Sequence, residues 1–139
     1  LVEGLDLAPG RGEVAPTIGQ FDPEELAYEI GIGPPGSLFF RGSLLTGLNG
    51  PGGVVEESQD TGIWRHDGTT AHLVAREGDP APGVPGTSFT PFGSVPTTPF
   101  STGLGGLAFQ APIVIPGFLF TNEFGLWVDR GTGLDFVAR

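Results

Sequence analysis

Cysteine, methionine and lysine are absent from this chain of 139 residues, and each absence excludes a class of chemistry or partner. Without cysteine the chain has no disulfide bond, no zinc–thiolate site and no thiol nucleophile. Its only cationic residues besides histidine are six arginines, and sixteen acids leave a net charge of −10. This balance disfavours nucleic acids and anionic membrane surfaces. No apolar run approaches the roughly 20 residues of a membrane helix, so we expect no membrane span.

The missing methionine indicates that residue 1 is not a translation start, so we expect a chain that was processed or cut from a longer one. Together with the acidic balance and the lack of cysteine, this predicts an extracellular or cell-surface location. The sequence contains no N-glycosylation sequon. The Thr- and Pro-rich stretch 96–102 has the composition that accepts O-linked glycans, but we favour a polar turn as its explanation.

Glycine and proline, by contrast, are abundant, with 25 and 14 residues. Such a content approaches that of disordered chains, but 38% of the residues are hydrophobic, which is enough for a core. We therefore expect a folded chain of short segments that are separated by many turns.

The sequence repeats itself. Residues 62–76 align without a gap on residues 125–139, and seven of the fifteen positions are identical. Two shorter echoes pair 38–42 with 107–111 and 6–10 with 79–83. Because the offset between the copies changes along the chain, the repeated elements must be joined by loops of different length. We assign a first β repeat to residues 1–73 and a second to residues 74–139.

Each repeat has the sequence pattern of short β-strands. Runs of β-forming residues are bounded by Gly and Pro, and Asp67-Gly68 and Gly131 mark hairpin turns. About four strands fit into each repeat. One short helix is predicted at 22–30, where Asp22 could act as N-cap and Pro23 as the first helical residue. The predicted fold class is all-β with two blade-like repeats of antiparallel strands, and a β-sandwich is the alternative.

Short motifs in the second repeat add a family resemblance. Gly105-Gly106-Leu107-Ala108-Phe109 matches a G-x-x-A-F motif, residues 74–83 look like the stretch that precedes it, and 122–125 form an N-x-x-G step. These residues resemble the bacterial tandem repeats that are named for an N-x-x-G-x-x-A-F motif and are found in exported and surface-anchored proteins. The resemblance implies propeller-type blades of four antiparallel strands, and it implies no catalytic residues.

The two ends of the chain fall at the same phase of the repeat. We therefore expect the start of one chain to complete the end of its neighbour by β-strand complementation, in a head-to-tail homopolymer that forms a filament or a ring. The predicted function is that of an exported structural protein. The residues expected to carry assembly are the donors Leu1, Val2, Leu5 and Leu7 and the acceptors Leu134, Phe136 and Val137. The alternative is a carbohydrate-binding or adhesion module from a longer surface repeat protein, with glycans as partners.

Large aromatic residues recur at equivalent places in the two repeats. Trp64 corresponds to Trp127, and Phe40 corresponds to Phe109. Exposed tryptophans could stack on sugar rings, whereas buried ones would anchor the sheets. Their position in apolar strands favours the core.

No motif in the sequence indicates catalysis or a cofactor. His66 and His72 flank a predicted turn, and a G-x-S-x-G nucleophile elbow is absent. The acidic stretches 22–25 and 56–60 could supply oxygen ligands to calcium, but they lack the spacing of an EF-hand loop. Sixteen acids always offer carboxylate pairs, and nothing singles out a glycosidase pair. We therefore predict a protein that is not an enzyme, with calcium as the one cofactor left open.

Overall fold

The computed structural model describes residues 7–9, 17–22, 30–32, 38–47, 49–50, 53–92, 100–101, 106–117 and 123–139. Within these segments the regular structure is β, apart from one short 3-10 turn, η1 (Glu57–Gln59). The predicted all-β fold class is confirmed.

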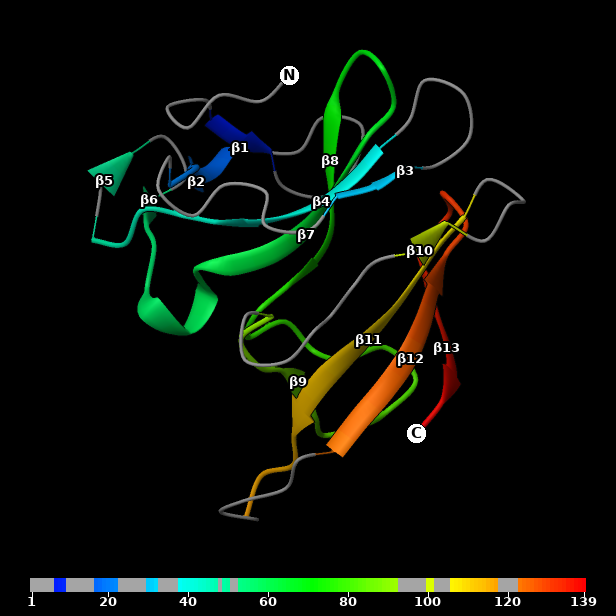
Figure 1. Cartoon of the computed structure of the whole chain (residues 1–139). Coiled ribbons are helices and arrows are strands. Elements are labelled where there is room, and N and C mark those ends of the chain that lie inside the picture. The colour runs from blue at the N-terminus through cyan, green and yellow to red at the C-terminus, as the bar shows by residue number, and fades with distance from the viewer. Residues whose placement is uncertain are drawn as a thin grey trace.

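Two antiparallel sheets make up most of the described structure (Figure 1). The first sheet has the order β3-β4-β7-β8, with strands β3 (Ile30–Ile32), β4 (Leu38–Ser43), β7 (Thr61–His66) and β8 (Ala71–Arg76). The second has the order β10-β11-β12-β13, with strands β10 (Phe100–Ser101), β11 (Leu107–Val114), β12 (Glu123–Asp129) and β13 (Leu134–Ala138).

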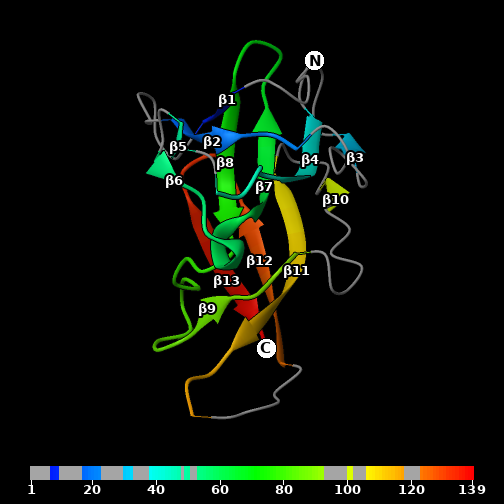
Figure 2. The same ribbon diagram turned by 90° about the vertical axis from the view of Figure 1, so that its left-hand side faces the viewer.

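Shorter strands accompany the two sheets. Strand β9 (Ser88–Phe89) pairs with the end of β11. Two ribbons are formed by β1 (Leu7–Pro9) with β2 (Thr17–Gln20) and by β5 (Asn49–Gly50) with β6 (Gly53–Val54). Figure 2 shows strands β7 and β8 side by side, with the tip of their hairpin pointing away from β9.

Two predictions from the sequence, the helix at 22–30 and the boundary between the repeats, can be compared with the observed strands. Of the predicted helix at 22–30, residues 23–29 lie outside the described residues, and Ile30 belongs to strand β3. The boundary predicted between residues 73 and 74 falls inside β8, which pairs with β7 along its length. In the structure the first sheet ends at Arg76, where the pairing of β7 with β8 ends. A comparison of repeated sequence segments does not show where main-chain pairing ends.

The repeat extends to the packing of aromatic rings. Each unit holds three equivalent rings, which are Phe21, Phe40 and Trp64 in the first and Phe89, Phe109 and Trp127 in the second. Phe40 stacks on Trp64 with ring centroids 6.0 Å apart and an interplanar angle of 17°. Phe109 stacks on Trp127 with ring centroids 6.2 Å apart and an interplanar angle of 24°. The third ring meets the tryptophan edge-on at 4.9 Å in both units. Each unit is thus built around the same aromatic triad.

A glycine two residues before each tryptophan makes room for its indole ring. A Cβ atom added at Gly62 would lie 2.8 Å from Cη2 of Trp64, and one at Gly125 would overlap the ring of Trp127. Such distances are shorter than real packing contacts, so only glycine leaves this space free. The repeated Gly-x-Trp motif therefore records a packing requirement.

The two units pack against each other in the same orientation. We call the side of each sheet that carries its tryptophan the Trp face. Phe40 and Trp64 on the Trp face of the first sheet form a small cluster with Phe21. Phe39, Ile63 and Ala75 on the other face of that sheet join a larger core that contains the Trp face of the second sheet. The first sheet is therefore buried on both faces.

Candidate functional site

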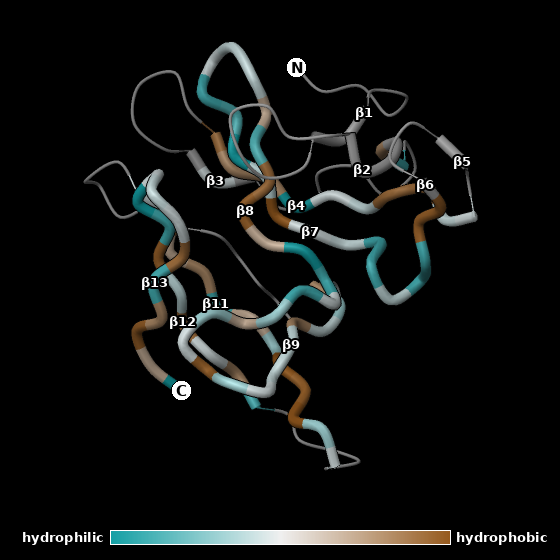
Figure 3. Tube along the Cα trace, turned by 180° about the vertical axis from the view of Figure 1, so that it is seen from behind, coloured by the Kyte–Doolittle hydropathy of each residue, from teal (hydrophilic) through white to brown (hydrophobic). Residues whose placement is uncertain are grey.

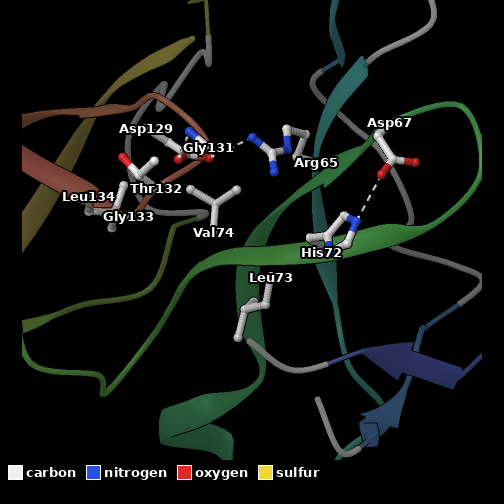
Figure 4. Close-up of a pocket in the computed structure, with 10 residues that line it drawn as sticks. All are labelled: Arg65, Asp67, His72, Leu73, Val74, Asp129, Gly131, Thr132, Gly133 and Leu134. Carbon is white, nitrogen blue, oxygen red and sulfur yellow. Dashed lines mark hydrogen bonds and ion pairs between the residues drawn. The ribbon is translucent and has the colours of Figure 1, made fainter. Parts of the chain in front are cut away.

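A cavity lies at the seam between the β7–β8 and β12–β13 hairpins and has a volume of about 450 Å³ (Figure 4). Its lining comes from both sheets and is mostly polar or small: Arg65, Asp67, His72, Leu73, Val74, Asp129, Gly131, Thr132, Gly133 and Leu134. The site exists only because the two units pack together.

One ion pair crosses the seam. Nη1 of Arg65 on β7 lies 3.7 Å from Oδ2 of Asp129 on β12, and the Asp129 carboxylate is largely buried. The other oxygen of Asp129 accepts a hydrogen bond of 2.8 Å from the backbone N–H of Gly131, which holds the hairpin turn. Within the described part, Nε of Arg65 is buried without a hydrogen-bond partner. The ion pair connects the two units electrostatically.

A second charged group stabilises the tip of the β7–β8 hairpin. Oδ1 of Asp67 accepts hydrogen bonds from the backbone N–H groups of Thr69 and Thr70, and Oδ2 lies 3.0 Å from Nε2 of His72. The two backbone hydrogen bonds, and then the contact with His72, hold the pKa of Asp67 far below its usual value. The carboxylate is therefore ionised at neutral pH and acts as a cap of the turn.

His66 also belongs to this turn, because its Nδ1 accepts a hydrogen bond from the N–H of Gly68 at 3.1 Å. Thr132 carries the one hydroxyl group among the lining residues. The described residues hold no group of three or more His, Cys, Asp and Glu side chains that could bind a metal ion. The polar groups of the cavity therefore serve to hold the two hairpins together, through the ion pair of Arg65 with Asp129.

Further polar contacts tie the units together away from the cavity. Nη1 of Arg41 on β4 donates to the backbone carbonyl of Phe92 at 3.1 Å, and the N–H of Phe92 donates to Oγ1 of Thr61 at 3.1 Å. Within the second unit, Nε1 of Trp127 donates to the carbonyl of Pro82 at 2.9 Å. These bonds satisfy polar atoms that the packing removes from water.

A buried acid, Glu77, was not expected from the sequence. It follows β8 directly and is 5% exposed, and its carboxylate accepts a hydrogen bond of 2.9 Å from Thr61 Oγ1. Burial, together with the nearby Asp60, raises the pKa of Glu77 to about 7. In the sequence, Glu77 is marked only by its position directly after the Val-Ala-Arg end of β8, which does not by itself predict burial.

The predicted assembly residues fall into four groups. Leu1, Val2 and Leu5 lie outside the described residues, and Leu7 lies in β1. Leu134 and Phe136 are half-buried and pack against the shared core of their own chain, whereas Val137 is 53% exposed. Within one chain, β1 pairs with β2 and contacts β8, so it is not paired with β13.

The four repeated aromatic residues lie in the interior. Trp64, Trp127 and Phe109 have no exposed surface, and Phe40 is 3% exposed. A buried indole cannot stack on a sugar ring, so neither tryptophan is available as a carbohydrate platform.

The fold and the seam together define an all-β protein in which two antiparallel sheets pack against each other. The chain belongs to the Family of unknown function (DUF7453), whose model matches residues 32–139. No curated protein and no solved structure matches it. In the segments that the structure describes, no helix has the length and apolar character needed to cross a membrane.

Proposed function

We propose that the chain is an exported structural protein whose units assemble head to tail with those of neighbouring chains. The observation that supports this best is the packing inside the chain, where the Trp face of the second unit covers the opposite face of the first sheet. Two different surfaces meet in this contact, so it is heterologous. Heterologous contacts between like units continue into rings or filaments.

Strand β13 supplies an edge for strand complementation. It stands at the end of the second sheet, and among the described strands it pairs with β12 alone. An edge strand offers unpaired main-chain N–H and C=O groups to an added strand. Since β1 already pairs with β2 in its own chain, the donated segment is residues 1–6, which contain Leu1, Val2 and Leu5.

Composition and resemblance support the exported location. The chain has no cysteine, carries a net charge of −10 and resembles a repeat family of exported and surface-anchored proteins. A strongly acidic surface keeps a secreted protein soluble and weakens its attraction to anionic lipids and nucleic acids.

Sedimentation velocity and negative-stain electron microscopy of the purified chain test the proposal. We expect assemblies that grow with protein concentration. A synthetic peptide of residues 1–6, added in excess, should compete for the β13 edge and shorten the assemblies, whereas a scrambled peptide of the same composition should not. A chain that remains monomeric up to about 1 mM overturns the proposal, because any self-contact is then weaker than about −4 kcal/mol. Assemblies that ignore the peptide overturn strand complementation alone.

A further inference from the structure

Two acidic side chains meet at the joint between the two units. Glu77 directly follows β8 and is 5% exposed, and Asp60 directly precedes β7 and is half-buried. Figure 3 shows that the chain is hydrophilic both just before β7 and just after β8. A side-chain hydrogen bond joins the two carboxyl groups. Because two ionised carboxylates have only acceptors, this hydrogen bond requires a proton on one of them.

Thr61 connects the acid pair to the second unit. Its Oγ1 donates to Oε2 of Glu77 at 2.9 Å and accepts a hydrogen bond of 3.1 Å from the backbone N–H of Phe92. The backbone N–H of Glu77 donates to the carbonyl of Thr61 at 2.9 Å. Phe92 has no exposed surface and packs against Phe89 and Phe109 in the shared core. One hydroxyl group therefore links the carboxyl of Glu77 to a core residue of the second unit.

At the equivalent place the second unit has an ion pair. Asp60 and Glu123 each stand two residues before the glycine of a Gly-x-Trp motif. Oε2 of Glu123 lies 2.9 Å from Nε of Arg139, which is the counterpart of Arg76. In the first unit, Nε of Arg76 donates instead to the backbone carbonyl of Gln59 at 2.8 Å. The acid that meets an arginine in the second unit thus meets another acid in the first.

The charged groups on the segments next to Glu77 are of both signs. They are Arg41 on β4, Glu56 and Glu57 at η1, Asp60, Arg76 at the end of β8 and Asp79 in the following turn. Asp60 acts on Glu77 both through the hydrogen bond and through its charge. Both arginines donate to main-chain carbonyls, Arg41 to that of Phe92 and Arg76 to that of Gln59. The charge that Glu77 meets is therefore that of another acid.

We propose that the proton shared by Glu77 and Asp60 closes the joint between the two units, and that loss of this proton to water opens it. The proposal concerns a contact inside one chain and is independent of the assembly proposed above. Without the proton, two adjacent carboxylates repel each other, and the buried one has lost its hydration without a hydrogen bond from its neighbour in return. Glu77 then gains by turning toward water, which breaks its hydrogen bond with Thr61 and loosens the contact of Thr61 with Phe92.

The pH range of the opening follows from the pKa of Glu77, which is about 7 in the closed joint and 4.5 at its usual value in water. The preference for the closed joint is therefore fully present below about pH 4.5 and is lost as the pH rises through 7. In this range the ratio of open to closed joint should rise about tenfold per pH unit, or about 300-fold in all. Above pH 7 the ratio should level off.

Hydrogen–deuterium exchange of the backbone N–H of Phe92, measured in the full chain and corrected for the intrinsic exchange rate at each pH, reports this opening. Glu77→Gln keeps an acceptor for Thr61 and offers an amide donor to Asp60, but it has no proton to lose. Its opening should therefore not depend on pH between 4.5 and 7. The matched control is Glu123→Gln, which changes the equivalent acid of the second unit and should keep the wild-type pH profile.

Several outcomes would overturn the proposal. Opening of the wild type that does not vary with pH contradicts it, and so does a pH profile that Glu77→Gln leaves unchanged or that Glu123→Gln abolishes. If the N–H groups at the centre of β11 open as often as that of Phe92 at every pH, the proton controls unfolding of the whole chain and no separate joint exists. If Glu77→Gln does not fold, Asp60→Asn removes the repelling charge instead, and a rise that is still about 300-fold overturns the proposal.

Discussion

Substitution of Gly125 by alanine tests whether the Gly-x-Trp motif is a packing requirement. A Cβ at this position would overlap three atoms of the Trp127 indole, namely Cη2, Cζ3 and Cζ2. Trp127 has no exposed surface, and its ring is held by Phe89, Phe109 and Phe136. The indole therefore cannot move aside without displacing other core rings.

The size of the effect follows from this overlap. Overpacking of a well-packed core destabilises proteins by about 1–3 kcal/mol, and the lower entropy of alanine in the unfolded chain returns about 0.4–1 kcal/mol. We expect Gly125→Ala to lower the free energy of unfolding by about 2 kcal/mol. Gly62→Ala should lower it by about 1 kcal/mol, because the added Cβ would lie 2.8 Å from the Trp64 ring and so overlaps it less.

Urea unfolding followed by circular dichroism measures both values, and a double-mutant cycle identifies their cause. Trp127→Phe alone should destabilise the chain by about 1–3 kcal/mol, because it leaves a cavity and removes the hydrogen bond to Pro82. In that background the smaller ring leaves room for Cβ, so Gly125→Ala should have little further effect. The coupling between the two substitutions should exceed about 1 kcal/mol.

Additivity of the two substitutions within about 0.5 kcal/mol would refute this reasoning, since it would mean that the glycine and the indole do not compete for space. Equal losses for Gly62→Ala and Gly125→Ala would also contradict it, because the two overlaps differ in depth.

Three further measurements test the site. The pKa of Glu77 is raised from its usual value of 4.5 to about 7, so between these values the folded chain keeps a proton that the unfolded chain loses. The contribution of Glu77 to stability is therefore fully present below about pH 4.5 and is lost, by about 3 kcal/mol, as the pH rises through 7. Thermal unfolding of Glu77→Gln should lack this part of the pH dependence. Asp129→Asn keeps an acceptor for the N–H of Gly131 and removes the charge that faces Arg65, so it should lower the free energy of unfolding by about 1 kcal/mol. Because the Asp129 carboxylate is largely buried, about 1 M NaCl should reduce this difference from wild type only in part. Because both tryptophans are buried, iodide and a panel of glycans should leave their fluorescence unchanged, and a sugar that quenches it would show that an indole is accessible.

Local features of the fold could be predicted because their causes are local. The hairpin turns are marked by glycines that adopt a positive φ, 96° at Gly68 and 89° at Gly131, a backbone conformation that other residues rarely adopt. The repeat was visible because the Gly-x-Trp motif serves the same ring packing in both units. Neighbouring residues suffice to identify such patterns.

Other features depend on residues that are far apart in the chain. Glu77 looks like one more solvated acid in a chain of sixteen, and only the contact with Thr61 and the surrounding packing make it a buried one. The candidate site was missed for the same reason, because Arg65 and Asp129 belong to different units and no spacing in the sequence indicates that they meet.

By itself, the sequence determined that this protein is all-β, that it contains two copies of one unit, and where its hairpins turn. These properties follow from turn chemistry and from the alternation of residues along single strands, which act over a few residues. Only the tertiary structure decided that, among the described residues, the first sheet has a core cluster on each face while the second has its core cluster on the Trp face. Val74 and Val137 occupy the same place in the repeat, but Val74 lies in the core that the two units share, whereas Val137 is exposed in the described part of the chain.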